Sequence, residues 1–189
     1  MKNTRKDIVN TAMKLYKEKG YDNTTVNDIC KHAHITKGTF YYHFPNKDEI
    51  AFEFYNQLFD DFSEKLIDIL MIPDEKEQLW KVYEYSIDRT IALTPSVLYP
   101  LIMSDIQNGF DLFSPYKSDN YESGRELTHK LILNITKKGQ QTGKIRQGDP
   151  VTMTTVYQSA LMGIAIAWAR SDGSFDEKEE LKKAFDLIY

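Results

Sequence analysis

The sequence predicts an all-α protein of about nine helices, and three observations support this fold class. Apolar residues recur with a period close to 3.6 in nearly every segment, and no segment shows convincing strand alternation. Glycine, proline and capping residues divide the chain at intervals that suit helices. At 189 residues the chain is long enough to bury a core without covalent staples.

The first two helices are read from local signals. An apolar stripe runs through residues 8–16, and Gly20 follows at a position where helices commonly end. Thr25 then caps a short helix with the sequence VNDICKHA. Asp28, three residues later, forms a weak version of the capping box.

A second short helix, KGTFYYH, follows after the turn at residues 33–35. Thr36 caps it, and the spacing of Ile35 and Phe40 is that of a hydrophobic staple. Pro45 ends it, because proline disfavours the helical conformation of the preceding residue. Two short helices joined in this way predict a helix-turn-helix, whose second helix enters the major groove of DNA.

The remaining chain is predicted to be helical with one long loop. Asn46 and Glu49 carry a third capping signature, and Ser174 and Glu177 carry another. Residues 109–124 have loop signals and are the expected mobile segment. We predict an N-terminal DNA-binding domain over 1–46 and a helical domain over 47–189. The helices expected in the second domain cover about 46–71, 75–93, a segment entered between Pro95 and Pro100, 125–142, 149–170 and 175–189.

Charge is distributed unevenly along the chain. The net charge is −4, but residues 1–47 hold nine Lys/Arg against four Asp/Glu, which gives +5. The rest of the chain therefore carries −9. A basic N-terminal domain on an acidic remainder favours one orientation toward a polyanion such as DNA. The first ten residues lack the apolar core of a signal peptide, and the uncharged run over 150–169 is too polar to span a bilayer. These features, with a single cysteine, predict a cytoplasmic protein without a membrane contact.

Catalytic and metal sites are not predicted. The sequence has no nucleophile–base set and no phosphate-binding loop, so we expect neither an enzyme nor a bound cofactor. Cys30, His32, His34 and His43 are the only plausible metal ligands near one another. Positions 30 and 32 point to different sides of a helix, and nothing completes a set of four ligands, which argues against zinc.

The run TTVNDICKHAHITKGTFYYHFPNKDEI resembles the signature of the TetR/AcrR family of transcriptional regulators over about 25 contiguous residues. The resemblance implies that Lys37, Thr39 and Tyr41 lie nearest base edges, and that Tyr42, Lys47 and the capping threonines hold phosphates. His34 departs from the small residue usual in the family's turn, although histidine tolerates a positive φ. The DNA-binding residues implied are Thr25, Thr36, Lys37, Gly38, Thr39, Tyr41, Tyr42, His43 and Lys47. Phe40 and Phe44 are expected in the core.

A pairing surface is expected near the end of the chain, where the resembling family forms dimers. Residues 160–169 (ALMGIAIAWA) are apolar on every side, and the following helix has a one-sided apolar stripe. Two such helices from each copy would form a four-helix interface. The alternative is that both helices are buried within one chain. The expected interface residues are Leu161, Ile164, Trp168, Leu181, Phe185 and Ile188.

The middle helices are rich in large aromatic residues, which at helical spacing are more often core than pocket. The resemblance implies a ligand cavity here, with a small, mainly apolar or aromatic effector. The expected lining is Phe62, Trp80, Tyr83, Ile87, Tyr99, Met103 and Tyr157. The sequence thus predicts a homodimeric repressor that binds a palindromic operator and is released by a ligand. The alternative is a regulator of the same fold controlled by a protein partner, or without any effector.

Overall fold

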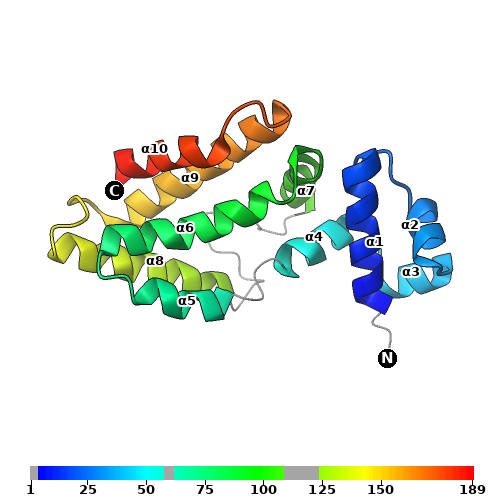
Figure 1. Ribbon diagram of the computed structural model, residues 1–189, viewed down its shortest axis with the longest axis horizontal. Helices are drawn as coiled ribbons and strands as arrows, with labels where there is room; N and C mark the ends of the chain where they lie inside the picture. The colour runs from blue at the N-terminus through cyan, green and yellow to red at the C-terminus, as the bar shows by residue number, and fades with distance from the viewer. Residues whose placement is uncertain (1–3, 58–61, 109–123) are drawn as a thin grey trace.

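The computed structural model describes residues 4–57, 62–108 and 124–189 of the chain. Within these ranges it contains ten α-helices and no strand, which confirms the all-α prediction (Figure 1). No helix in these ranges combines the length and hydrophobicity that crossing a membrane requires. The helices are α1 (Thr4–Lys19), α2 (Val26–Ala33), α3 (Lys37–His43), α4 (Asp48–Gln57), α5 (Phe62–Leu70), α6 (Glu75–Ile91), α7 (Pro95–Asn108), α8 (Gly124–Gln141), α9 (Pro150–Arg170) and α10 (Glu177–Ile188).

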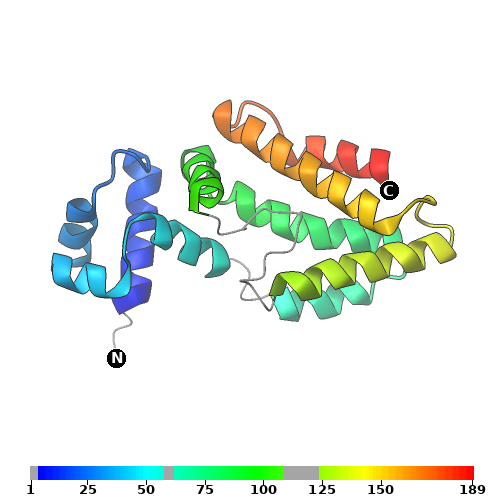
Figure 2. The same ribbon diagram turned by 180° about the vertical axis from the view of Figure 1, so that it is seen from behind.

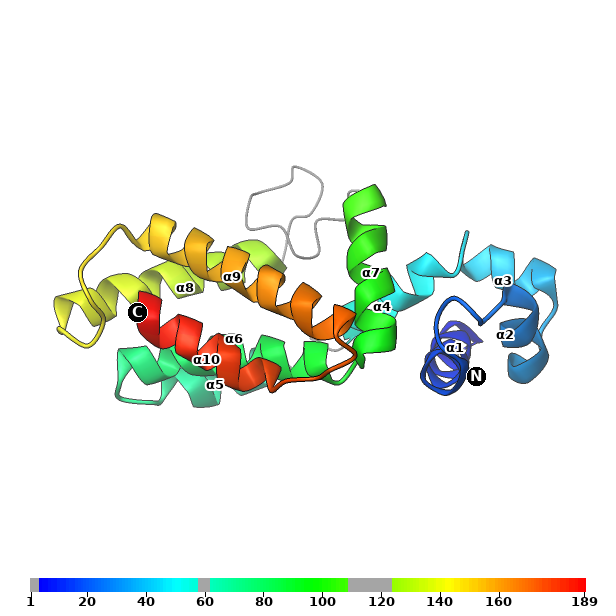
Figure 3. The ribbon, with the colours of Figure 1, turned by 90° about the horizontal axis from the view of Figure 1, so that it is seen from above.

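Helices α1 to α4, called the head below, form one end of an elongated molecule (Figures 1 and 3). The predicted stripe of α1 is buried, with Ile8, Ala12 and Tyr16 all 0 % exposed. Gly20 ends α1 with a φ of +84°, a conformation that glycine adopts without a steric cost. Phe40 of α3 is also fully buried in the same cluster, and α2 packs against α1 while α3 packs against α2.

The core of the head continues into the rest of the molecule. Ile50 and Ala51 of α4 are buried in it, and α4 packs against both α1 and α7. The same cluster includes Val97 and Leu101 of α7, together with Trp168 near the end of α9. Figure 3 shows α7 standing between the head and the remaining helices. Packing is therefore continuous on both sides of residue 46. The domain boundary expected there stays a prediction.

Helices α5 to α10 are called the body below (Figure 2), and all of them except α7 contribute to a second cluster. In this cluster α6 packs against α8 and α10, and α10 packs along α9. Its centre is aromatic: the ring centroids of Tyr83 and Tyr157 are 4.4 Å apart, and those of Phe185 and Tyr189 are 4.9 Å apart. Burial of these large rings, together with aliphatic side chains such as Leu79 and Leu181, stabilises the body.

Several boundaries differ from those expected. Of the helix predicted over 46–71, the structure describes α4 and α5, and the residues between them lie outside the described ranges; α4 packs into the head whereas α5 packs on α6. Helix α7 begins at Pro95 and runs through Pro100. The cap of α10 is Asp176, whose carboxylate accepts from the Glu179 amide, and not Ser174. The predicted loop lies outside the described residues, apart from the glycine at which α8 begins.

Candidate nucleic-acid interface

The start of α2 is a complete capping box. The Asp28 amide donates to Thr25 Oγ1 over 3.1 Å, and the Thr25 amide donates back to the Asp28 carboxylate over 3.0 Å. The Thr25 hydroxyl donates to the same carboxylate over 2.7 Å. These bonds from Thr25 lower the pKa of Asp28 to about 2. The prediction of the cap is confirmed, but the Thr25 hydroxyl proton is already engaged inside the protein.

The turn between α2 and α3 depends on His34. This residue has φ 55° and ψ 44°, and its amide donates to the Cys30 carbonyl at the end of α2. The positive φ expected from the sequence is therefore present at a non-glycine residue. Ile35 packs against the core cluster that contains Phe40, as the predicted staple requires. The turn thus sets the angle between α2 and α3 without a glycine.

Helix α3 divides into a buried and an exposed face. Thr36 caps it through the Thr39 amide over 3.1 Å, and the two threonine hydroxyls lie 3.0 Å apart. Lys37, Gly38, Tyr41 and Tyr42 are exposed, and Tyr42 is 85 % exposed. Phe40 and Phe44, on the opposite face, are 0 % exposed, which confirms that they belong to the core. His43 is half-buried beside the Tyr42 ring.

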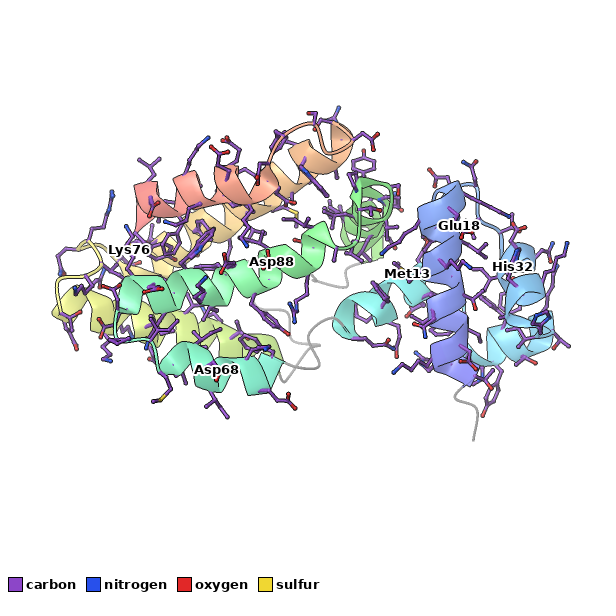
Figure 4. The ribbon with its side chains drawn as sticks, in the orientation of Figure 1. Met13, Glu18, His32, Asp68, Lys76 and Asp88 are labelled. Atoms are coloured by element: carbon purple, nitrogen blue, oxygen red, sulfur yellow. The ribbon has the colours of Figure 1, made fainter. Side chains whose placement is uncertain are left out.

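An exposed tyrosine contributes little to the stability of the fold, because its ring leaves apolar surface in contact with water. Two adjacent ones on a helix whose other face is fully anchored form a surface suited to phosphate and base contacts. His32 lies on the outer side of the head on α2 (Figure 4). Among the described residues, no group of three or more His, Cys, Asp or Glu side chains is placed to hold a metal ion.

Arg5 braces the end of α3, and sequence analysis missed it. Its guanidinium donates to the His43 carbonyl over 2.6 Å and to the Glu53 carboxylate on α4 over 3.0 Å. It also lies 4.3 Å from the centroid of the Phe44 ring. The hydrogen bond from Arg5 lowers the pKa of Glu53 below its ordinary value. Nothing local in the sequence signals this contact, because 38 residues separate Arg5 from His43.

Lys47 is not extended from the surface. Its ammonium donates to the carbonyls of Tyr21 and Thr24 over 2.9 Å and 3.4 Å. It also lies 4.2 Å from the centroid of the Tyr21 ring. Partial burial lowers the pKa of the ammonium, an effect that Asp22 opposes. The Lys47 ammonium is thus held by residues of the turn that follows α1.

The residues expected to line one ligand pocket differ in their burial and surroundings among the described residues. Trp80, Tyr83, Ile87 and Tyr157 are buried in the core of the body, where other rings surround them. The Tyr83 hydroxyl lies 3.1 Å from that of Tyr189, and burial raises the pKa of Tyr83 well above its ordinary value. Phe62 packs on Tyr85, Met103 is half-buried and Tyr99 is 37 % exposed on α7.

A hollow of about 360 Å³ lies elsewhere, at the end of the body away from the head. Figure 4 shows Lys76 at this end. The cations are offset by neighbouring carboxylates: Lys144 pairs with Asp74, and Lys76 and Lys182 pair with Asp186. Of the predicted lining, Trp80 alone belongs to the hollow, which is lined by Asp74, Lys76, Glu77, Trp80, Lys144, Lys182 and Phe185.

The expected pairing surface is divided in two by the structure. Leu181 and Phe185 are 0 % exposed and Trp168 is 8 % exposed, all within the chain's own core. Their side chains are therefore unavailable to a second copy, as the alternative of burial within one chain anticipates. Leu161, Ile164 and Ile188 are half-buried and remain accessible. A one-sided apolar stripe predicts that α10 packs on something, but it does not identify the partner.

Comparison with known proteins identifies the head. Residues 8–54 match the model of the bacterial regulatory proteins of the tetR family. The HTH-type transcriptional regulator YuxN of Bacillus subtilis is 35 % identical over 89 residues, which are 44 % of this chain and 31 % of that protein. The negative regulator IcaR of the icaADBC biofilm operon of Staphylococcus epidermidis is 42 % identical over 60 residues, 32 % of each chain. The matches thus span about a third of these relatives' length.

Solved structures resemble the whole chain. FadR of Thermus thermophilus, a TetR family repressor in complex with lauroyl-CoA, has a TM-score of 0.67 at 23 % identity, covering 97 % of this chain and 92 % of that one. A transcriptional regulator of Saccharomonospora viridis in complex with choline has a TM-score of 0.69 at 21 % identity, covering 100 % and 96 %. These similarities establish the fold of the body. The chain carries the N-terminal domain of the TetR family of bacterial regulatory proteins, with its helix-turn-helix in α2 and α3.

Proposed function

We propose that two copies of this chain bind a palindromic operator through α3 and repress transcription. The observation that carries the proposal is the division of α3: Phe40 and Phe44 hold one face in the core, while Lys37, Tyr41 and Tyr42 stand in solvent. In this proposal Lys37, Thr39 and Tyr41 meet base edges. Gly38 allows the backbone to approach the DNA, and the other contacts are to phosphates, from Thr36, Tyr42, His43 and the backbone amides next to Thr25 at the start of α2.

A dimer is proposed through the outer side of α9. Val156, Ser159, Gly163 and Ala167 are outward-facing residues at helical spacing, and none carries a charge. A side chain added at Gly163 would meet open space, so the backbone of a second copy can approach there. Leu161, Ile164 and Ile188 lie half-buried in the same pair of helices, and Leu187 of α10 is 73 % exposed. A two-fold axis through this surface would place two α3 helices on one face of the DNA.

Release by a small apolar or aromatic effector is the form of regulation that we propose. It is supported by the packing of α7 against α1, α4 and α9, since a ligand that moves α7 also moves the head. The solved relatives hold ligands as different as lauroyl-CoA and choline, so their chemistry does not select a class for this chain. One observation favours the alternative of a protein partner or no effector: the rings of Tyr83 and Tyr157, both expected in the pocket lining, pack against each other.

Selection of bound duplexes from a random DNA pool tests this function. The expected result is a two-fold symmetric sequence with half-sites one helical turn or a multiple of it apart. Gly163→Arg is expected to give a monomer in sedimentation and to bind the full site much more weakly than wild type, whereas Lys65→Ala on α5 changes neither. A pool without enrichment, or enrichment for an asymmetric site by a monomer, would contradict the proposal.

A further inference from the structure

Lys47 is a basic residue of the head. Its side chain is half-buried, whereas that of Lys37 is exposed. Its Nζ donates to the Tyr21 carbonyl over 2.9 Å and to the Thr24 carbonyl over 3.4 Å. The third side of the ammonium faces the Tyr21 ring, whose centroid is 4.2 Å away. An ammonium has three donors, and two of them are already directed at carbonyl oxygens.

The two carbonyls belong to the turn that joins α1 to α2. Thr24 is 1 % exposed, and its hydroxyl donates to the Gly20 carbonyl over 2.8 Å. The Tyr21 ring packs on the ring of Tyr16, with centroids 4.9 Å apart, and the Tyr16 hydroxyl donates to the Lys47 carbonyl over 3.1 Å. Contacts therefore link α1, this turn and the residue that precedes α4 to one another.

The turn held by Lys47 leads directly into Thr25, the cap of α2. Because the capping box fixes the first turn of α2, a displacement of residues 21–24 displaces α2 and, through the His34 turn, α3. To direct these two engaged donors at a phosphate instead, Lys47 would have to leave both carbonyls. Both carbonyls would then lose a charge-assisted hydrogen bond, which is among the stronger kinds in proteins.

We propose that Lys47 is a positioning residue for DNA recognition, which holds the α1–α2 turn and thereby α2 and α3, and that it makes no phosphate contact. This inference rests on the proposed function, since it presupposes that the chain binds DNA. It differs from the role implied by the family resemblance, in which the lysine at this position holds a phosphate. The two roles differ in how DNA affinity responds to salt.

Three matched variants separate the roles: Lys47→Met, Lys37→Met and Lys65→Met. A lysine that neutralises a phosphate contributes about 0.9 to the slope of log affinity against log salt. We expect Lys47→Met to lower affinity for the selected operator about tenfold, because two hydrogen bonds from a charged donor are lost, with the slope unchanged. Lys37→Met should flatten the slope by up to about one unit. Lys65→Met, on the body, should change neither quantity.

A flatter slope in Lys47→Met, or an unchanged affinity, would overturn the inference. Lack of salt-dependent operator binding by wild type would instead refute the proposed function. Should Lys47→Met fail to fold by circular dichroism, wild-type protein labelled with ¹⁵N in its lysine side chains decides the question. The Lys47 ammonium resonance is expected to be visible before DNA is added, because its bonds slow proton exchange, and to stay in place afterwards. A ³¹P coupling on the DNA complex would overturn the inference.

Discussion

The head and the body of this protein are held together in different ways. The head relies on polar side chains that bind backbone atoms: Arg5 on the His43 carbonyl, Lys47 on two carbonyls, and Thr25 and Thr36 at helix starts. The body relies on stacked aromatic rings around Tyr83. Helices of eight and seven residues are too short to persist alone, so α2 and α3 need their ends fixed. The longer helices α6, α9 and α10 of the body are capped as well, but their length makes them less dependent on those caps, and core packing supplies most of their stability.

The largest expected effect is in the body. Phe185→Ala removes a fully buried ring that packs against those of Trp80, Tyr157 and Tyr189. The free energy of unfolding should fall by about 3–5 kcal/mol, measured by urea denaturation. Ile67→Ala, at a 67 % exposed position of α5, is the control and should cost less than about 0.5 kcal/mol. Similar losses for the two variants would mean that the aromatic cluster does not dominate the body.

The second-largest expected effect concerns the buried carboxyl group of Glu177. Its substitution should stabilise the protein, whereas Phe185→Ala should destabilise it. Both carboxylate oxygens of Glu177 are buried without a hydrogen-bond partner, and burial raises its pKa to about 7. A carboxyl with a raised folded pKa favours folding while it is protonated, so its contribution is lost as pH rises from about 4.5 through 7. Glu177→Gln should therefore raise the free energy of unfolding by about 1–3 kcal/mol at pH 8 and change it little at pH 5. Glu180→Gln, exposed on the same helix, should show no such pH dependence.

The brace at the end of α3 should give an intermediate effect. Arg5→Met removes the bonds to His43 and Glu53, and we expect a loss of about 1–2 kcal/mol at pH 7. A double-mutant cycle with Glu53→Gln should give a coupling energy above about 0.5 kcal/mol. Because the folded pKa of Glu53 is depressed, this coupling is present above the ordinary carboxyl pKa and disappears as pH falls below it. A coupling that persists unchanged in acid would contradict the assignment.

The smallest effect is expected for a single cap. Thr25→Ala removes the side-chain oxygen that accepts from the Asp28 amide and should cost about 1 kcal/mol in thermal or urea unfolding. Thr25→Ser keeps the hydroxyl and should retain most of that stability. If both substitutions cost the same, the methyl group and not the cap would be the stabilising part.

The comparison also explains which features could be read from the sequence. Thr25 with Asp28, and Asn46 with Glu49, contact residues three positions away, so residue type and spacing suffice to predict them. Arg5 meets His43 across 38 residues and Lys47 meets Tyr21 across 26, and no local pattern encodes either pair. Local signals also predicted α3, and the family resemblance supplied the residues of α3 that are expected to contact DNA.

In the body, apolar spacing predicted the helices but not their partners. The stripe containing Leu181 and Phe185 is buried against α9 and α6 of the same chain, whereas the sequence suggested a second copy. The aromatic residues Tyr83 and Tyr157 were expected around a ligand and are instead packed on each other. Periodicity identifies which side of a helix is covered; it carries no information on what covers it.

The core that joins α1, α4, α7 and Trp168 has a consequence for how this molecule melts. A head that shares its apolar interior with α7 is not a detachable module, and cutting the chain after α4 would leave Ile50 and its neighbours facing water. Head and body should accordingly unfold in one cooperative transition. Any molecule that binds only the folded body then raises the melting temperature of the DNA-binding helices as well. Thermal protection of α3 by a compound becomes a way to find effectors without DNA in the assay.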